Sequence, residues 1–161
     1  MRTTRICDIM TEAPVCCEPQ TPLHEAARLM AEHDCGELPV VDDLKNRMPI
    51  GVVTDRDICC RAVAQGLDPT RLSVENCMSS PALCISRDET LERCVELMEK
   101  NQIRRLPVVD ASGRVCGMIS QADISQFVED REAAEVLRAV SRRSSQPSAI
   151  NYDQLNGGRV W

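Results

Sequence analysis

A five-residue run, Leu-Pro-Val-Val-Asp, occurs twice in this chain, at residues 38–42 and again 68 residues later at residues 106–110. Each copy is followed by a Gly-x-x-Thr/Ser-x-x-Asp pattern, formed by Gly51, Thr54 and Asp57 and then by Gly117, Ser120 and Asp123. A period of this length indicates one supersecondary unit used twice, since solenoids repeat over shorter distances. Two such units can bury their apolar faces against each other, and the cleft between them is a natural place for a ligand.

The charge balance argues against a nucleic-acid partner. The net charge is −6 at pH 7, which disfavours contact with a phosphate backbone. Phe127, Tyr152 and Trp161 are the only aromatic residues, so platforms for base stacking are missing. No apolar run approaches the ~18 residues of a membrane span, and the N-terminal residues contain no apolar signal-peptide segment. We therefore expect a cytoplasmic protein with neither a nucleic-acid nor a membrane partner.

The ten cysteines leave several interpretations open. No Cys-x-x-Cys pattern occurs and only two histidines are present, His24 and His33, so spaced zinc-ligand patterns are missing. Cys94 and Cys116 stand where the apolar pattern would place aliphatic side chains, which suits free thiols that act as small hydrophobes. Buried reduced thiols are the favoured interpretation. The alternatives are metal binding and redox sensing through a vicinal pair, either Cys16–Cys17 or Cys59–Cys60.

The first unit has the pattern β-α-β-β-α. Thr21 and Pro22 predict a helix N-cap followed by proline at the first helical position. Apolar residues spaced by three and four positions predict that this helix runs to about residue 33. The strands are predicted at residues 15–18, 38–41 and 50–53. A second helix is expected from residue 54 or 55 to about Gly66, a common type of helix stop.

The second unit repeats this order. Asp88 is predicted to cap its first helix, and the second helix is expected from Gln121. The strands are predicted at residues 82–85, 106–109 and 115–120. We therefore predict an α/β (α+β) fold of two β-α-β-β-α repeats related by a pseudo-two-fold. The predicted boundaries are repeat 1 at 6–66, a linker at 67–74, repeat 2 at 75–130, and a helical extension with a flexible tail at 131–161.

Catalytic motifs are missing from this sequence. It contains no P-loop, no Gly-x-Ser-x-Gly elbow and no Gly-x-Gly-x-x-Gly after a strand. A Cys/His nucleophile pair would have to use His24 or His33, and both lie on the first predicted helix. We therefore expect a protein that is not an enzyme and holds no catalytic cofactor or metal.

The Thr54/Asp57 and Ser120/Asp123 pairs are the better candidates for function. A hydroxyl between a strand end and a helix start can face backbone N–H groups and the positive end of the helix dipole, which suits a phosphate. The carboxylate three residues later lies one turn into the helix, where it could accept hydrogen bonds from a ribose diol. The alternative is a helix N-cap with an acidic first turn. Because both features occur in both repeats, the sequence favours the ligand interpretation.

The residues before the repeated run supply a second element. Gly36 would let backbone approach a ligand closely, and Pro39, which follows Leu38, removes a hydrogen-bond donor at the strand's start. In the second copy this glycine is replaced by Arg104, which is followed by Arg105. Arginine suits bidentate contacts to phosphate. The alternative is that these arginines are surface charges beside a helix end.

Taken together, these motifs resemble the cystathionine β-synthase (CBS) domain, here as a tandem pair or Bateman module over about residues 6–128. Further markers are Asp-Ile-Met-Thr at 8–11 and Asn-Cys-Met-Ser at 76–79, where the repeats start. The segments Thr-Asp-Arg-Asp-Ile at 54–58 and Gly-Leu-Asp-Pro at 66–69 are similar to small stand-alone bacterial pairs. The resemblance implies a non-enzymatic sensor of an adenosyl ligand: AMP first, or ADP, ATP, NAD or S-adenosylmethionine.

The resemblance also implies which residues bind the nucleotide, because each cleft takes its hydroxyl and carboxylate from one repeat and its adenine walls from the other. One cleft would hold Ser120, Asp123, Met118, Thr11, Val15, Cys35, Gly36, Leu38 and Pro39. The other would hold Thr54, Asp57, Val52, Ser79, Ala82, Ile103 and Pro107, with Arg104 or Arg105 at phosphate.

The assembly is implied in the same way. CBS pairs usually associate through their helices, so we expect a homodimer that passes ligand occupancy to an unknown downstream protein. Its face would be supplied by Ile58, Cys59, Ala62, Val63, Ile124 and Phe127. Two alternative functions remain open besides the nucleotide sensor. One is a thiol-based redox or metal-responsive protein on the same scaffold, and the other is a structural adaptor with empty clefts.

Overall fold

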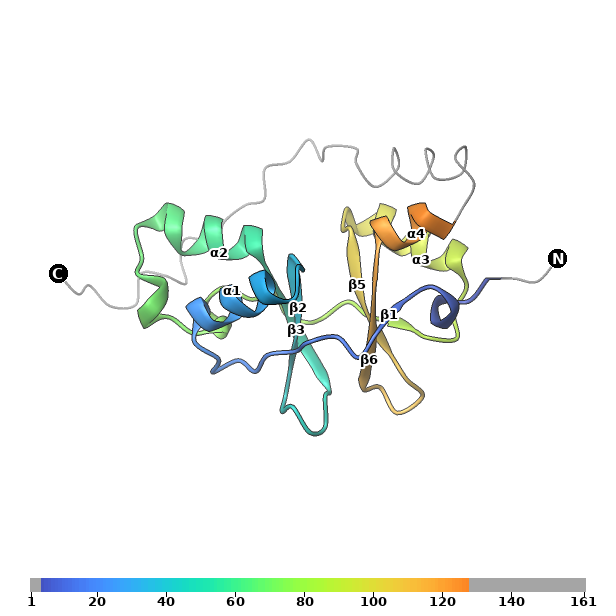
Figure 1. Cartoon of the computed structure of the whole chain (residues 1–161), viewed down its shortest axis with the longest axis horizontal. Helices are drawn as coiled ribbons and strands as arrows, with labels where there is room; N and C mark the ends of the chain where they lie inside the picture. Colours follow the sequence, from blue (N-terminus) through green and yellow to red (C-terminus); the bar gives the residue numbers. More distant parts are fainter. Residues whose placement is uncertain (1–3, 128–161) are drawn as a thin grey trace.

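The strands of the two repeats meet at the centre of the molecule and the helices lie on its outer flanks (Figure 1). This computed structural model describes residues 4–127 of the chain. The predicted extension and tail at 131–161 lie outside the described residues. Four strands form one sheet in the order β1-β6-β5-β4, and β2 and β3 form a second. The mixed α/β class and the two repeats are confirmed.

Repeat 1 forms its elements around the first Leu-Pro-Val-Val-Asp run, which lies on β2. Its main elements are α1 (Leu23–Glu32), β2 (Glu37–Val41), β3 (Pro49–Thr54) and α2 (Asp55–Arg61). They are preceded by a short 3-10 turn η1 (Ile6–Asp8) and strand β1 (Thr11–Glu12), and followed by turns η2 (Val63–Gln65) and η3 (Pro69–Arg71). The predicted strand at 15–18 is reduced to a bridge, in which Cys17 pairs in parallel with Val40.

Repeat 2 has the same order and the same register. Its elements are η4 (Val74–Asn76), β4 (Ile85–Ser86), α3 (Leu91–Asn101), β5 (Arg105–Val109), β6 (Val115–Ser120) and α4 (Gln121–Phe127). Pro39 lies opposite Val52 in the β2–β3 hairpin, and Pro107 lies opposite Met118 in β5–β6. The parallel β4–β5 pair is the counterpart of the Cys17–Val40 bridge.

Two predicted helix caps are wrong. The cap of α1 is Pro22, because the Thr21 hydroxyl accepts a hydrogen bond from Glu18 N at 3.0 Å and closes the turn before the helix. The cap of α3 is Thr90 and not Asp88, since the Thr90 hydroxyl accepts from Arg93 N at 3.3 Å. For α3, Asp88 and Thr90 both stand close before the helix, so the sequence pattern alone did not choose between them; for α1, the hydroxyl expected to cap the helix is used in the preceding turn instead.

Each repeat has its own apolar core. Leu38, Val40 and Val53 are fully buried in the first core, as are Leu106, Val108 and Ile119 in the second. Burial of such side chains stabilises each half by roughly 1.5–3 kcal/mol per residue. These are the apolar positions of the repeated run and of the strand that follows it, so the repetition in sequence reflects a repetition in packing.

The segment that starts each repeat packs against the other repeat. We call residues 6–12 and 74–79 the crossing segments. Ile6 is buried in the second core, whereas Val74 and Cys77 are buried in the first. Ile6 N donates to Glu89 O at 3.0 Å, and Val74 N donates to Thr21 O at 2.9 Å. The predicted boundaries at 6–66 and 75–130 stay a prediction, but neither core is completed by one such stretch alone.

The crossing segments also extend the hairpins. Thr11 of β1 pairs with Met118 of β6, and the equivalent Ser79 pairs with Val52 through N–O distances of 2.8 and 2.9 Å. Gly51 makes the second approach possible, since a Cβ there would lie 2.7 Å from Ser79 O. Among the described residues, no helix combines the length and apolar character that crossing a bilayer requires.

Candidate functional site

The predicted hydroxyl and carboxylate are brought together in both repeats. Thr54 ends β3 and Asp57 lies in the first turn of α2. The Thr54 hydroxyl and the Thr54 N–H both donate to Asp57 Oδ2, at 2.8 and 3.0 Å, and Asp57 N donates to Thr54 Oγ1 at 3.0 Å. In repeat 2, Ser120 and Asp123 form the same three bonds, at 2.6, 2.8 and 3.2 Å.

These bonds form a reciprocal capping box at the start of each helix. The helix-cap interpretation is therefore correct for both pairs. It does not exclude binding, because the box uses one carboxylate oxygen, Oδ2, and a ligand could use the other. We call the residues around these pairs the Thr54 cleft and the Ser120 cleft, after the two ligand clefts that the resemblance implies.

The crossing segments place residues of one repeat beside the hydroxyl–carboxylate pair of the other. Thr11 lies against Met118, two residues before Ser120, and Ser79 lies against Val52, two residues before Thr54. The resemblance implied that these residues of different repeats share a cleft; their role as walls of a nucleotide site stays a prediction. The pairing follows from the glycines that precede these strand residues, because Gly51 and Gly117 admit the crossing backbone.

The remaining predicted wall residues lie around the cores. Val15 and Cys35 are half-buried and pack against the first core, and Ile103 packs against the second. Ala82 is half-buried, whereas Pro39 and Pro107 are buried. Leu38 is fully buried within the first core, so its side chain serves packing and only its backbone could contact a ligand.

Arg105 reaches from repeat 2 to the Thr54 cleft. Its backbone lies opposite Ser120, but a Cβ on Gly36 would lie 3.3 Å from both terminal nitrogens of its guanidinium and 2.9 Å from Asp55 Oδ2. Gly36 thus leaves the space in which Arg105 and Asp55 converge. Arg104 has an exposed side chain, and its carbonyl accepts from Gln121 N at 2.8 Å.

Glu37 is a member of this cluster that sequence reasoning missed. The pKa of its carboxyl is raised to about 7, chiefly by burial; Arg105 opposes this shift, whereas Asp57 and Asp55 contribute to it. A signal was present in the sequence, because Glu37 and Arg105 occupy the same position of the repeated strand with opposite charges. The pseudo-two-fold brings such positions close to each other.

Arg61 is a second residue that the sequence did not single out. It lies one turn after Asp57 on α2, and i,i+4 residues of a helix are neighbours. Its guanidinium is 3.3 Å from Asp57 Oδ1. It also donates to Cys77 O at 2.7 Å, to Met78 O at 3.0 Å and to Ser79 Oγ at 3.1 Å. It thereby fastens the second crossing segment to α2.

The cysteines are free thiols. Cys16, Cys17, Cys77 and Cys94 are buried and Cys59 is exposed. Burial raises the pKa of Cys17, and likewise that of Cys94, to about 12, so both are protonated at neutral pH and poorly nucleophilic. Within residues 4–127, no group of three or more His, Cys, Asp or Glu residues is placed to hold a metal ion.

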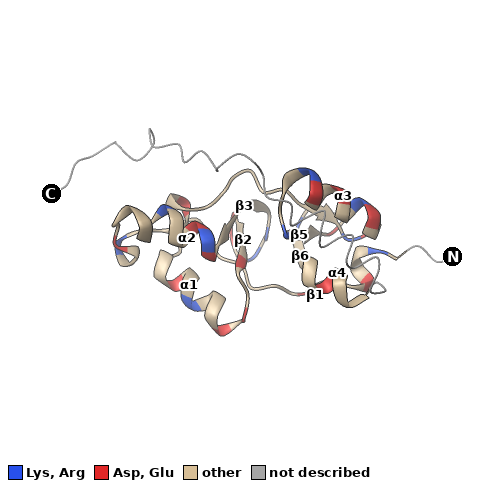
Figure 2. Cartoon of the chain, turned by 90° about the horizontal axis from the view of Figure 1, so that it is seen from above, with Lys and Arg blue, Asp and Glu red and all other residues tan. Residues whose placement is uncertain are grey.

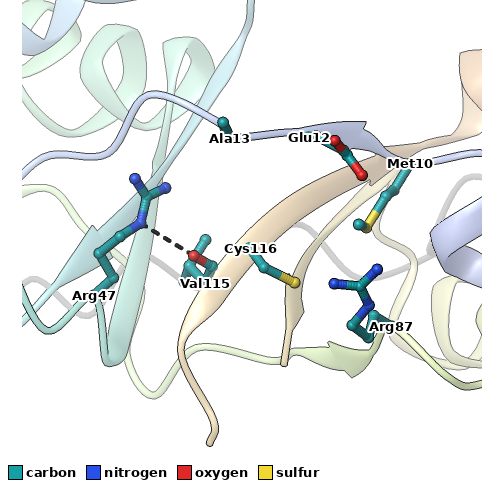
Figure 3. A pocket seen from close by; sticks show the side chains of 7 residues that line it. All are labelled: Met10, Glu12, Ala13, Arg47, Arg87, Val115 and Cys116. Atoms are coloured by element: carbon teal, nitrogen blue, oxygen red, sulfur yellow. Dashed lines mark hydrogen bonds between the residues drawn. The ribbon is translucent and has the colours of Figure 1, made fainter. Parts of the chain in front are cut away.

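Helices α2 and α3 both carry charged residues of both signs (Figure 2). A cleft of about 360 Å³ lies at the start of β6, at the opposite end of this strand from Ser120 (Figure 3). It is lined by Met10, Glu12, Ala13, Arg47, Arg87, Val115 and Cys116. The Arg47 guanidinium donates to Val115 O at 3.1 Å and to Pro14 O at 2.8 Å, so it joins the two repeats here.

Comparisons with known proteins agree with this geometry. The family model described as "CBS domain" matches residues 6–62 and 74–130. The chain is 31% identical over 140 residues to hypoxic response protein 1 of Mycobacterium tuberculosis, covering 87% of this chain and 94% of that protein. It is 31% identical over 126 residues to the uncharacterized protein MK0525 of Methanopyrus kandleri, covering 78% of this chain and 63%, less than two thirds, of that relative.

Solved structures give the same assignment. The structure of hypoxic response protein I with two coordinated zinc ions is 31% identical to this chain, with a TM-score of 0.69. The match covers 78% of this chain and 100% of that one. The CBS domain pair of protein MJ0100 with 5′-methylthioadenosine and S-adenosyl-L-methionine is 28% identical, with a TM-score of 0.69 and coverage of 78% and 96%. CBSX2 with AMP is 27% identical, with a TM-score of 0.68 and coverage of 76% and 94%.

Proposed function

The chain belongs to the CBS-domain family as a tandem pair, and from this premise we propose that it is a regulatory module binding an adenosyl ligand between its repeats. The observation that carries this proposal is the crossed pairing, in which Thr11 lies against Met118 and Ser79 against Val52. It places backbone from one repeat beside the hydroxyl and carboxylate of the other. A ligand in either cleft would contact both repeats.

The ligand class is supported by the solved relatives, whose structures hold AMP in one case and 5′-methylthioadenosine with S-adenosyl-L-methionine in another. These molecules share adenine and a ribose with two adjacent hydroxyls. In this chain the Oδ1 atom of Asp57 or Asp123 would accept from the ribose, because the capping box uses Oδ2. The base would lie against the apolar walls, and AMP is our first candidate.

Further parts of the proposal concern role and assembly. We propose that the protein is cytoplasmic, performs no catalysis and acts as a homodimer that signals ligand occupancy to another protein. The expected dimer face is smaller than the sequence suggested, since Ile58, Ala62 and Ile124 are buried in the cores. Val63 and Phe127 are 56% and 54% exposed; Val63 follows α2 in the chain and Phe127 ends α4, and these two helices lie on the same side of the strands (Figure 1).

The direct test is thermal unfolding with AMP, 5′-methylthioadenosine, S-adenosylmethionine, ATP and NAD. A ligand that binds the folded state alone adds about 2.7 kcal/mol of stability per site at 100 times its Kd, which corresponds to a rise in Tm of roughly 5–10 °C. The control is the double variant Asp57→Asn with Asp123→Asn, which should unfold without this shift. The proposal is wrong if none of the five ligands raises the Tm at millimolar concentration.

A further inference from the structure

The two cleft carboxylates have different surroundings, although their capping boxes are the same. Asp57 Oδ2 accepts two bonds from Thr54, and Asp57 Oδ1 is paired with Arg61 at 3.3 Å. Asp123 Oδ2 accepts two bonds from Ser120. Asp123 Oδ1 makes no hydrogen bond and no ion pair with any other residue in the range 4–127.

The residue that makes this difference is fixed in place. Arg61 uses its guanidinium to donate to the carbonyls of Cys77 and Met78 and to the hydroxyl of Ser79, besides its pairing with Asp57. Moving it would leave two backbone carbonyls without these partners, at the cost of unmade hydrogen bonds. At the equivalent position of repeat 2 stands Phe127, which has no donor to offer.

Counting acceptor positions shows what this means for a ribose. A carboxylate has about four lone-pair sites, and a ribose diol donates two hydrogen bonds. The capping box takes two sites in each cleft. Asp123 Oδ1 therefore remains available to a diol, whereas Asp57 Oδ1 is held in an ion pair with Arg61, and a diol would have to compete with the guanidinium for this oxygen. The charges near Asp57 are of both signs, since Glu37 senses Arg105 as well as Asp57 and Asp55, so the comparison of the two clefts is best made with a ligand that carries no phosphate.

We propose that Arg61 makes the clefts unequal by holding Asp57, so that the ribose of an adenosyl ligand is recognised at Asp123, in the Ser120 cleft. This inference rests on the proposed function and adds which cleft is used and which residue decides it. Arg61 would not touch the ligand. It would set the specificity of the Thr54 cleft by holding, through an ion pair, the carboxylate oxygen that a diol needs.

The test is isothermal titration calorimetry of the full chain with adenosine, which carries the diol and no phosphate. We expect one adenosine per chain. Asp123→Asn should weaken binding about ten- to a hundredfold, since a hydrogen bond to a charged group is lost. Asp57→Asn should leave the Kd within about twofold. 2′-Deoxyadenosine should bind weakly to the wild type and to the Asp57→Asn variant alike, because it lacks one of the two hydroxyls.

A second variant tests the role of Arg61 itself. Arg61→Met keeps a long unbranched side chain but removes the ion pair with Asp57 together with the hydrogen bonds to Cys77, Met78 and Ser79. In the folded variant we expect a second adenosine per chain, because Asp57 is then free to accept from the ribose. Adding Asp57→Asn should remove the second site again, which a change in fold alone would not do. Arg56→Met is the matched control, since Arg56 is an exposed arginine on the same helix, and it should leave one site.

The outcomes separate the two proposals. Equal losses from Asp57→Asn and Asp123→Asn, or a folded Arg61→Met variant without a second site, would overturn the assignment to Arg61 while the nucleotide-binding function stands. If Arg61→Met does not fold, the comparison of the two aspartate variants decides. Wild-type protein that binds neither adenosine nor AMP would overturn the proposed function and this inference together.

Discussion

At the scale of single residues, the most informative side chain is Glu37. Its pKa of about 7 in the folded protein lies well above the value of about 4.3 of an unfolded glutamate. Between these values the folded state binds more protons than the unfolded state, so the free energy of unfolding falls as the pH rises. The destabilisation is complete above the folded pKa and is absent below the unfolded one.

We predict that Glu37→Gln removes this part of the pH dependence. The variant should be more stable than the wild type at pH 8 by about 1 kcal/mol, a moderate value because water screens a half-buried group. The difference should shrink toward pH 5, where the wild-type carboxyl is protonated. Thermal unfolding at pH 5, 6, 7 and 8 measures it, with the exposed Glu89→Gln as control. A constant difference at all four pH values would contradict the assignment to Glu37.

Part of the candidate site could be predicted from single residues. The Thr54/Asp57 and Ser120/Asp123 pairs could be predicted because the two residues of each pair are only three positions apart in the sequence. The start of the helix between them determines their geometry. Arg61 could not be recognised in this way, because its partners Cys77, Met78 and Ser79 lie 16–18 residues away. Glu37 and Arg105 are farther apart still, and only the pseudo-two-fold brings them together.

At the scale of elements, the contact between hairpin and crossing segment depends on glycine. We predict that Gly51→Ala destabilises the protein by about 1–3 kcal/mol, because its Cβ would lie 2.7 Å from the backbone oxygen of Ser79. Gly36→Ala is the matched control. The nearest atoms there belong to the ends of the Asp55 and Arg105 side chains, which can move, so we expect a cost of about 0.5 kcal/mol.

Chemical denaturation of the two glycine variants makes the comparison. Equal costs would show that the backbone contact between Val52 and Ser79 is not tight in solution. The Gly51→Ala variant should also expose the amide protons of Val52 and Ser79 to faster hydrogen exchange, since these N–H groups form the bridge. Protection that is unchanged would contradict the same contact.

The elements differ in how far the sequence predicted them. The main helices and the hairpin strands follow from apolar periodicity, which α1 and α3 show along their buried faces. Strand β1 has two residues, Thr11 and Glu12, and both are exposed. It therefore has no periodicity to detect. Its pairing with β6 depends on a crossing of the chain that a local pattern cannot contain.

At the scale of the whole molecule, we predict a homodimer of about 36 kDa, twice the chain mass of 17.9 kDa. Light scattering at tens of micromolar protein measures it. Val63→Glu should give a monomer, because a charge would enter the proposed apolar face. Leu44→Glu is the control, since Leu44 has the same exposed fraction of 56% but lies in the loop between β2 and β3. A wild-type monomer would contradict the prediction.

The crossing segments have a consequence for dissection of the chain. A cut near Gly66 would leave an N-terminal fragment that carries Ile6 but not Val74 or Cys77, and a C-terminal fragment with the opposite composition. Each fragment would lack side chains of its own core and keep those of the other. The two fragments should therefore fold only when they are mixed. Each fragment would then supply the core side chains that the other lacks, and both clefts should form together.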